Sequence, residues 1–364
     1  MDVLTELTDR IKAAAAQGRA LRIRGGGSKD FLAARLEGEL LSTAGLSGIT
    51  SYEPSELVVT VRAGTPLAEL EAVLAERGQC LPFEPPHFGG GATVGGMVAA
   101  GLSGPARASV GSVRDYVLGL TLVNGKGEQL TFGGQVMKNV AGYDVARLMA
   151  GAWGTLGLIA EVSLKVLPQA PAEATLKFEM PQAEALRRLN AWGGQPLPLN
   201  ASCWVDDGGV PTLYLRLRGA AAAVEAACGT LGGERQDNAD VAADWLLCRD
   251  QRLPWFQERG GRELWRLSVP QTAPVLELPE PPLVEWHGGQ RWVRAEPGTG
   301  ERLHAAAGTA GGHATLFIAS EAGGARAASP FDALKPPLDR IHRELKRQFD
   351  PAGIFNPGRL YPDL

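Results

Sequence analysis

The sequence predicts an α+β protein with two domains, the second inserted into the first. Its 364 residues are too many for one ordinary hydrophobic core. Glycine clusters and short β runs crowd the first part of the chain, whereas seven of the eight tryptophans lie between Trp192 and Trp292. The last segment is again rich in proline and glycine, which fixes a rigid path and suits a return to the first domain.

The first part of the chain alternates helix and strand signals. Gly18 and Gly78 stand where a left-handed residue would end a helix. Thr65 followed by Pro66 predicts an N-cap and a first helical position. The expected elements are a helix at 3–17, strands at 21–24 and 57–62, a helix at 66–77, a hairpin at 117–123 and 128–132, a helix at 144–150 and a strand at 158–167.

A break at Pro168 to Pro171 opens the second part, in which strand and helix signals alternate. This pattern predicts an antiparallel sheet with helices on one face. The expected strands are 175–178, 213–217, 264–269, 290–294 and 314–318, and the expected helices are 183–192, 220–231, 301–307 and 338–349. The predicted domain limits are 1–172 for the first domain, 173–329 for the inserted cap and 330–364 for the returning segment.

Composition excludes several classes of function. A net charge of -4 does not favour nucleic acid or an anionic membrane as a partner. The four cysteines are scattered and form no C-x-x-C pair, so the sequence predicts neither a metal site nor an iron–sulfur cluster. The chain shows neither a signal-peptide pattern nor an apolar run of membrane-spanning length. We therefore expect a cytoplasmic protein with no membrane span of its own.

Two glycine segments have the pattern of a diphosphate site. The first follows a predicted strand and reads Arg24-Gly25-Gly26-Gly27-Ser28. Successive glycines can form a concave nest of N–H donors, although three glycines after a strand are more often a simple turn. The second, Gly89–Gly101, begins a helix of small residues whose N-terminus would add its dipole and free N–H groups. Its alternative is a tightly packed core helix.

A third segment combines Lys138–Asp144 with Gly151–Ile159, where glycines three apart precede a strand. Taken alone, it also fits an ordinary helix-to-strand connection. No P-loop motif is present, and neither glycine cluster completes the G-x-G-x-x-G of a dinucleotide-binding fold.

The three segments and the tail motif Asn356-Pro357-Gly358, in this order, resemble the FAD-binding domain of the vanillyl-alcohol oxidase (p-cresol methylhydroxylase) family. Within it, the chain is similar to the shorter FAD-binding subunits of bacterial glycolate oxidases. The resemblance covers about 200 residues. It implies an FAD domain of two α+β subdomains with an inserted antiparallel-sheet cap.

The resemblance also implies the residues that contact FAD. Many relatives bond FAD covalently through a histidine in these loops. Here Ser28 follows Gly27, so we expect non-covalent FAD. The implied cofactor-binding residues are Arg24, Gly25, Gly26, Gly27, Ser28, Thr93, Val94, Gly95, Gly96, Gly154, Gly157, Ile159 and Asn356.

The substrate site is less evident from the sequence. The five histidines are dispersed and do not repeat the metal site of the larger relatives. Oxidation of a 2-hydroxy acid needs a cation for the carboxylate, and the local candidates for a catalytic pair are Arg291 and His287. These two residues fit ordinary strand packing equally well.

The resemblance implies an FAD-dependent oxidoreductase that takes part in the oxidation of glycolate and similar 2-hydroxy acids to 2-oxo acids. The implied partners are a larger FAD-containing subunit and an iron–sulfur subunit, through which the complex would associate with the inner face of the membrane. Two alternatives stay open: a self-sufficient FAD-dependent 2-hydroxy-acid or alcohol oxidoreductase, and a non-catalytic scaffold subunit that holds FAD.

Overall fold

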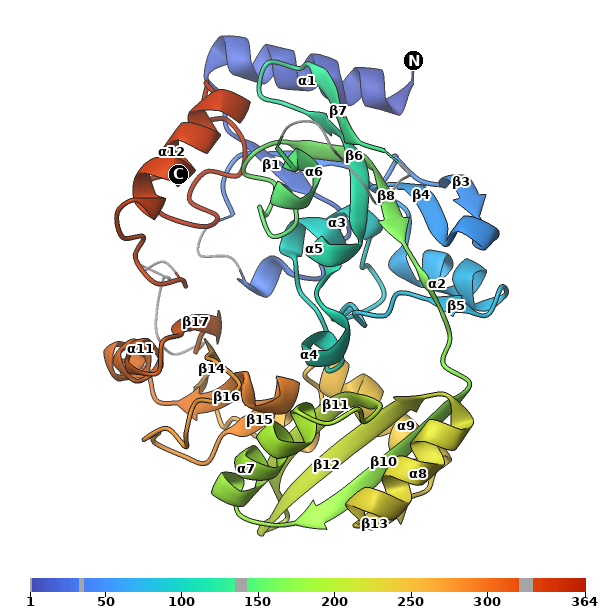
Figure 1. Ribbon diagram of the computed structural model, residues 1–364. Coiled ribbons are helices and arrows are strands. Elements are labelled where there is room, and N and C mark those ends of the chain that lie inside the picture. The colour runs from blue at the N-terminus through green and yellow to red at the C-terminus, as the bar shows by residue number, and fades with distance from the viewer. Residues whose placement is uncertain (1, 33–35, 135–142, 321–329) are drawn as a thin grey trace.

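The structure, a computed structural model, describes residues 2–32, 36–134, 143–320 and 330–364. It consists of two bodies joined by an extended segment (Figure 1). We call the upper one, which comprises the elements from α1 to β9 together with α12, the first body. The lower one, from β10 to β17, is the cap. The C-terminal helix lies in the first body, beside α1 and β1 (Figure 1).

A small α/β layer forms one end of the first body. Helix α1 (Val3–Gln17) ends at Gly18, whose φ of 62° is left-handed, as predicted. Strand β1 (Leu21–Arg24) pairs in parallel with β2 (Glu39–Ser42). The C-terminal tail completes this layer, because Leu21 bridges Phe355 in parallel. The first and last segments of the chain thus share one core.

A five-stranded antiparallel sheet, in the order β3-β4-β8-β6-β7, forms the rest of the first body. Helices α2 and α3 bury their apolar side chains against it. The strands are β3 (Ile49–Glu53), β4 (Val58–Arg62), β6 (Val117–Val123), β7 (Gln129–Gly133) and β8 (Leu158–Lys165). The other elements of this body are η1 (Asp30–Leu32), η2 (Pro54–Glu56), α2 (Leu67–Ala75), β5 (Gln79–Cys80), α3 (Val94–Ala100), α4 (Arg107–Val110), α5 (Val113–Tyr116), α6 (Val145–Leu148), β9 (Leu167–Pro168) and α12 (Leu338–Phe349).

One predicted helix cap is wrong. Helix α2 begins at Leu67, and Pro66 rather than Thr65 is its N-cap residue. The Thr65 hydroxyl donates instead to the carbonyl oxygen of Arg62, at 2.8 Å. It therefore fastens the preceding turn rather than the helix.

The cap is built on an eight-stranded sheet in the order β13-β10-β12-β11-β15-β16-β14-β17. All its pairs are antiparallel. The strands are β10 (Ala172–Glu179), β11 (Leu199–Asp207), β12 (Val210–Gly219), β13 (Glu234–Gln236), β14 (Glu263–Ser268), β15 (Leu283–Glu285), β16 (Gln290–Ala295) and β17 (His313–Ile318). The helices are α7 (Gln182–Gly193), α8 (Ala221–Leu231), α9 (Asn238–Arg249), α10 (Pro254–Gln257), α11 (Gly300–Thr309) and the short η3 (Trp286–Gly288).

Helices cover both faces of the cap sheet, so the prediction of helices on one face is wrong. Helices α7, α8 and α11 pack on the outer face. Helices α9 and α10 pack on the inner face, in a cluster that also includes Leu32, Ala100 and Leu102 of the first body. The inner face is thus the one turned towards the first body.

The sheet order supports the division drawn from the sequence. Strand β10, the first of the cap sheet, begins at Ala172, and the residues after β17 include the helix that rejoins the first body (Figure 1). We propose the domain limits 1–172, 173–329 and 330–364. Pro330 and Phe331 still pair with β17 of the cap: the N–H of Leu316 donates to the carbonyl oxygen of Pro330 at 2.8 Å, and Thr315 bridges Phe331.

Candidate functional site

A cavity that is open to solvent lies in the first body where four segments meet. These segments are the loop after β1, the start of α3, the turn before β8 and the C-terminal tail. The lining residues are Ile23, Arg24, Gly25, Gly26, Gly27, Ser28, Lys29, Asp30, Thr43, Ala63, Thr93, Gly95, Gly96, Ala99, Ala100, Trp153, Gly154, Gly157, Ile159, Asn356 and Arg359. The cavity therefore unites all the glycine segments found in the sequence.

The first two glycine segments touch, backbone against backbone. A Cβ atom on Gly26 would lie 1.3 Å from the carbonyl oxygen of Gly91, and one on Gly25 would lie 2.2 Å from Oγ1 of Thr93. Real atoms cannot come this close. Only glycine at these two positions lets the loop after β1 reach the segment that begins α3.

The loop after β1 presents unused donors. Among the described residues, the main-chain N–H groups from Gly25 to Lys29 have no hydrogen-bond acceptor within the protein. Gly27 has a φ of 73°, which turns the chain into a concave nest. Such a nest fits the oxygen atoms of a diphosphate.

The charges at the cavity suit the same group. Arg24, Lys29 and Arg359 line it, against one carboxylate, Asp30. Arg24 forms an ion pair with Asp30 at 2.7 Å. Lys29 is buried, and its ammonium group donates to the Ser28 hydroxyl at 3.3 Å. Burial lowers the pKa of Lys29 to about 8, although the nearby charge of Asp250 raises it. The site thus holds a positive excess that a diphosphate would balance.

The start of helix α3 differs from the prediction. Its first N–H groups are not free: those of Val94 and Gly95 donate to the carbonyl oxygens of Thr65 and Ala63, and that of Gly96 donates to Oγ1 of Thr93. These groups hold α3 against β4 and are not available to an anion. What α3 offers is a flat wall of small residues: Gly95, Gly96, Ala99 and Ala100.

Asn356 joins the tail to two other cavity segments. Its Oδ1 accepts from the N–H of Ile23 at 2.7 Å, and its Nδ2 donates to the carbonyl oxygen of Trp153 at 2.7 Å. Its own φ of 43° is left-handed, a conformation that asparagine tolerates better than most residues. This side chain therefore holds three separate segments in register.

Most of the cofactor-binding residues expected from the sequence line this cavity. Val94 does not: it is fully buried in the core of the first body. That the other twelve contact FAD stays a prediction. Lys138–Asp144 falls largely outside the described residues. Asp144, the last of the segment, caps α6 by accepting from the N–H of Arg147.

Several lining residues were not found from the sequence. Lys29 directly follows the segment Arg24–Ser28, and Arg359 directly follows Asn356-Pro357-Gly358. Extending each motif by one residue would have included them. Thr43 and Ala63 follow strands β2 and β4 and carry no local signal. They reach the cavity only because the strands end there.

Arg291 and His287, the catalytic candidates, do not line the cavity. Along β16, Trp292 packs in the inner-face cluster and Val293 in the outer one, so alternation places Arg291 on the outer face. It is fully buried, and its Nη2 donates to the carbonyl oxygen of Ala273 at 3.3 Å. This position corrects the expected carboxylate clamp, since the guanidinium is sealed behind the sheet.

His287 lies between the two bodies. Its Nδ1 pairs with the Ser202 hydroxyl of β11 at 3.1 Å, and its Nε2 pairs with the Ser109 hydroxyl of α4 at 3.0 Å. Burial lowers the pKa of His287 to about 4. The imidazole is therefore neutral at neutral pH and joins the bodies through two hydroxyl groups.

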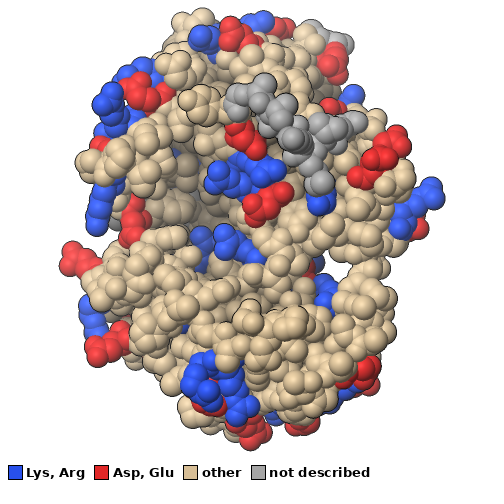
Figure 2. Space-filling model, in the orientation of Figure 1, with Lys and Arg blue, Asp and Glu red and all other residues tan. Residues whose placement is uncertain are grey.

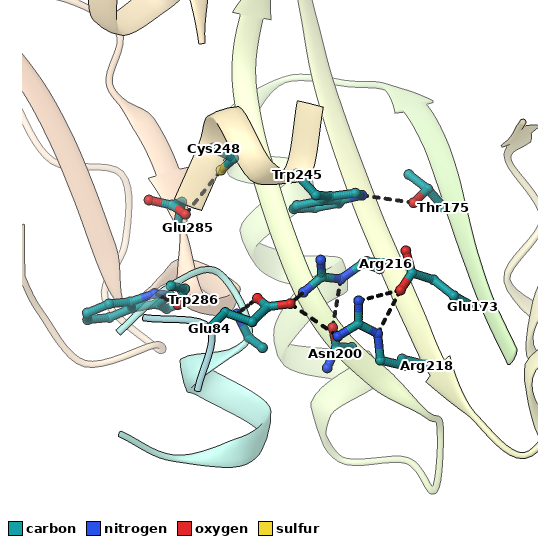
Figure 3. A network of polar contacts seen from close by, with 12 residues as sticks. Glu84, Glu173, Thr175, Asn200, Arg216, Arg218, Trp245, Cys248, Glu285 and Trp286 are labelled. Atoms are coloured by element: carbon teal, nitrogen blue, oxygen red, sulfur yellow. Dashed lines mark hydrogen bonds and ion pairs between the residues drawn. The ribbon is translucent and has the colours of Figure 1, made fainter. Parts of the chain in front are cut away.

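A buried polar network also ties the cap to the first body (Figure 3). Glu84, from the first body, pairs with Arg216 at 2.6 Å and with Arg218 at 3.1 Å, both on β12. The other oxygen of Glu84 accepts from the N–H of Ala106 at 3.1 Å. Nearby, the indole N–H of Trp286 donates to the carbonyl oxygen of Gly104 at 3.0 Å. These contacts fix the cap in orientation against the segment that precedes α4.

Among the described residues, no group of three or more His, Cys, Asp or Glu side chains is arranged to hold a metal ion. Within the same ranges, every helix is too short or too polar to span a bilayer.

Comparison with known proteins agrees with this geometry. Residues 4–133 match the family of FAD binding domains. The glycolate oxidase subunit GlcE of Escherichia coli (strain K12) is 44% identical over 364 residues, which is 100% of this chain and 99% of that protein. A D-lactate dehydrogenase of Anaerostipes hadrus is 36% identical over 131 residues, but these are 36% of this chain and 27% of the dehydrogenase.

A solved structure shows the same fold. Alkyldihydroxyacetonephosphate synthase superposes with a TM-score of 0.64 over 97% of this chain and 74% of its own, at 14% sequence identity. At this identity the likeness concerns the fold alone. The FAD domain match and the full-length likeness to GlcE establish FAD as the cofactor, and the chain belongs to the family of FAD-dependent oxidoreductases that includes the glycolate oxidase subunit GlcE.

Proposed function

We propose that this chain is the FAD-binding subunit of a glycolate oxidase complex, which oxidises glycolate and similar 2-hydroxy acids to 2-oxo acids. The observation that carries the proposal is the 44% identity to GlcE over the whole chain. It includes the cap as well as the FAD domain, whereas the D-lactate dehydrogenase match covers 36% of this chain.

The cavity supports a defined role for each segment. The N–H groups from Gly25 to Lys29 would hold the diphosphate, with Lys29 as a buried counter-charge. The small residues of α3 would face the flat ring, and Gly154 and Gly157 would admit the adenine side. When bound, FAD supplies the two-electron acceptor for a carbon–hydrogen bond next to a hydroxyl group. No histidine lines the cavity among the described residues, and Ser28 follows Gly27 in the loop after β1, so we propose non-covalent binding.

The partners are part of the proposal. A two-electron flavin donor must pass electrons to a one-electron carrier, and this chain has only four scattered cysteines. We therefore propose a larger FAD-containing subunit and an iron–sulfur subunit in the same complex. We place the complex in the cytoplasm, at the inner face of the membrane through those partners.

The test compares the chain alone with the assembled complex under anaerobic conditions. Bleaching of the flavin absorbance near 450 nm by glycolate in the complex, but not in the chain alone, is the expected result. Robust reduction of the flavin by glycolate in the chain alone would instead favour a self-sufficient oxidoreductase. If glycolate reduces the larger subunit's flavin and never this one, the chain is a scaffold.

A further inference from the structure

The inner face of the cap sheet carries polar side chains opposite the first body, where a buried sheet face would be apolar. Arg266 of β14 lies opposite Trp292 of β16 and Thr315 of β17. Two residues further along β14, Ser268 lies opposite Gln290 of β16 and His313 of β17. Trp292 packs in the inner-face cluster. Side chains alternate between the two faces of a sheet, so the residues paired with Trp292, and those two positions away on each strand, also lie on the inner face.

Arg266 is a cation without a carboxylate partner. Among the described residues, no acidic group forms an ion pair with it. Its guanidinium lies over the ring of Phe317, 5.9 Å from the centroid. Burial, and then the positive charge of Arg107, lower its pKa to about 10. The fold therefore holds a guanidinium in surroundings that disfavour its charge.

Arg107 brings a second guanidinium from the other body. It begins α4, and the structure gives it no ion pair within the described ranges either. Its guanidinium lies over the ring of Trp286, 4.5 Å from the centroid. Burial lowers its pKa, and the charge of Asp115 only partly opposes this. The positive charge of Arg107 also acts on Arg266, as the lowered pKa of Arg266 shows, so the two guanidinium groups lie near each other across the seam. An anion between them would offset this repulsion.

The position of Arg107 is held by a strained turn in the cap. Trp286 and His287 both have left-handed φ values, 54° and 53°, although neither is glycine. Through this turn Trp286 bonds to Gly104 and His287 to Ser109, on either side of Arg107. Strain of this kind persists where the surrounding structure uses it, often at a ligand site.

The seam between the bodies adjoins the FAD cavity. Phe317, under Arg266, contacts Phe31 at 5.7 Å and Phe88 at 6.1 Å between centroids. These rings belong to the cluster that includes Ala100 and Trp153, both of which line the cavity. Figure 2 shows Lys and Arg side chains gathered at the hollow between the two bodies. A ligand at Arg266 would thus lie at the cap end of the cofactor site.

We propose that Arg266 and Arg107, one from each body, form a carboxylate-binding site for the small acid that this flavoprotein meets. The proposal rests on the proposed function. A guanidinium presents a rigid fork of N–H donors that matches a carboxylate. The rings of Trp286 and Phe317 lie against the two guanidinium groups. Because the two cations belong to different bodies, the site is complete only when the cap is docked.

The test measures binding rather than turnover. Oxalate, a small dicarboxylate without an oxidisable carbon–hydrogen bond, is titrated into the oxidised, FAD-loaded chain, and the visible flavin spectrum is followed. We expect Arg266→Met and Arg107→Met each to raise the Kd about tenfold or more, and Arg266→Lys to lie in between. Arg294→Met is the matched control, since Arg294 is on the same sheet but lines a separate cavity. Equal Kd values in all variants that keep their flavin would overturn the site.

Two further arms separate this proposal from others. Inorganic phosphate that displaces oxalate with a lower Kd would overturn carboxylate as the ligand class. In the assembled complex, glycolate that fails to bleach the flavin, while oxalate binding still depends on Arg266 and Arg107, would contradict the proposed function but not the anion site. Normal bleaching by glycolate in complexes that carry either methionine variant would contradict the anion site but not the proposed function.

Discussion

Gly26 lies so close to Gly91 that a Cβ atom on it would sit 1.3 Å from the carbonyl oxygen of Gly91. These residues are 65 positions apart in the sequence, and their contact closes one wall of the FAD cavity. The steric reason for Gly26 is therefore the neighbouring loop, in addition to any ligand. We predict that Gly26→Ala abolishes FAD retention, measured as the ratio of flavin to protein after gel filtration.

Gly90 provides the matched control for that experiment. A Cβ atom there has nothing within 4 Å, so Gly90→Ala should keep the wild-type flavin content. Loss of flavin in both variants would show that the segment tolerates no change and that close packing of Gly26 is not the cause. Normal flavin in Gly26→Ala would contradict the two-loop cavity.

Lys29 should make FAD binding sensitive to pH. Burial lowers its pKa to about 8 in the unbound chain, while Asp250 opposes the shift. Binding of a dianion favours the protonated amine, so the affinity should be constant below pH 8 and fall above it, by at most about tenfold per unit. The unbound chain should show the opposite trend. Its free energy of unfolding should rise between pH 8 and the ordinary lysine pKa, because the unfolded state there binds more protons.

Lys29→Met isolates this effect. It should weaken FAD binding at pH 7 and flatten the pH dependence, as measured by fluorescence titration of the apoprotein with FAD. Lys12→Met, on α1 away from the cavity, should leave both unchanged. An unaltered slope above pH 8 in Lys29→Met would mean that another group titrates.

Glu84 should stabilise the docked cap through its charge. Burial raises the pKa of Glu84, but Arg216 and Arg218 outweigh that effect and hold it below the ordinary 4.5. The stabilisation is therefore complete above pH 4.5 and is lost as the pH falls through the lower, folded-state value. Glu84→Gln leaves two guanidiniums without their shared carboxylate and should cost about 3 kcal/mol, measured by urea denaturation at pH 7.

The exposed pair Glu225–Arg235 on the outer side of the cap is the control for Glu84. Its N···O distance is 2.8 Å and both side chains are largely exposed, so Glu225→Gln should leave the free energy of unfolding close to that of the wild type. If Glu84→Gln and Glu225→Gln lower the free energy of unfolding equally, the buried ion pairs of Glu84 do not stabilise the docked cap.

Asn356 should link the C-terminal tail to cofactor retention. Asn356→Gly permits the left-handed backbone but leaves the N–H of Ile23 and the carbonyl oxygen of Trp153 without partners. The expected loss is about 1–3 kcal/mol in urea unfolding, together with a lower flavin content. Asn356→Asp keeps the acceptor for Ile23 and should lose less. A variant indistinguishable from wild type would show that the tail is held by its backbone alone.

The flavin should be released when the chain is denatured. Ser28 has no nucleophilic nitrogen, and no histidine lines the cavity among the described residues. Acid precipitation should therefore leave the yellow colour in the supernatant, with FAD identified by chromatography. Fluorescence that stays with the polypeptide on a denaturing gel would refute non-covalent binding.

The glycine segments were accessible to sequence reasoning because backbone geometry imposes a local rule. A nest without Cβ atoms favours consecutive glycines, so Gly25–Gly27 pointed to the diphosphate end of the candidate site. Gly95–Gly96 pointed to the same cavity, but as part of its wall of small residues and not as a nest. Strand and helix periodicity likewise predicted β6, β8, α1 and α7 to within a few residues. Helix α9 was missed, because only Val241, Trp245 and Cys248 of its twelve residues are buried and the sheet that it packs against is built largely from other parts of the chain.

The substrate side was misjudged for a different reason. Arg291 and His287 lie in a distinctive run of residues, yet one step of strand alternation seals Arg291 behind the sheet. Arg266 and Arg107 stand in unremarkable runs, on elements of two different bodies, and carry no local pattern. These two residues come near each other only because the cap docks on α4. A local stretch of sequence carries no signal of that docking.

The sequence by itself determined the cofactor class, because phosphate recognition by backbone is encoded in residues that are neighbours in the chain. It also determined the division into two bodies, through the change in composition after Pro168, where most of the tryptophans are found. Only the tertiary structure decided which face each strand residue occupies, which donors stay free and which cations meet across the seam. Those properties arise from packing between segments that are distant in the chain, where burial removes water and makes an unpaired charge costly.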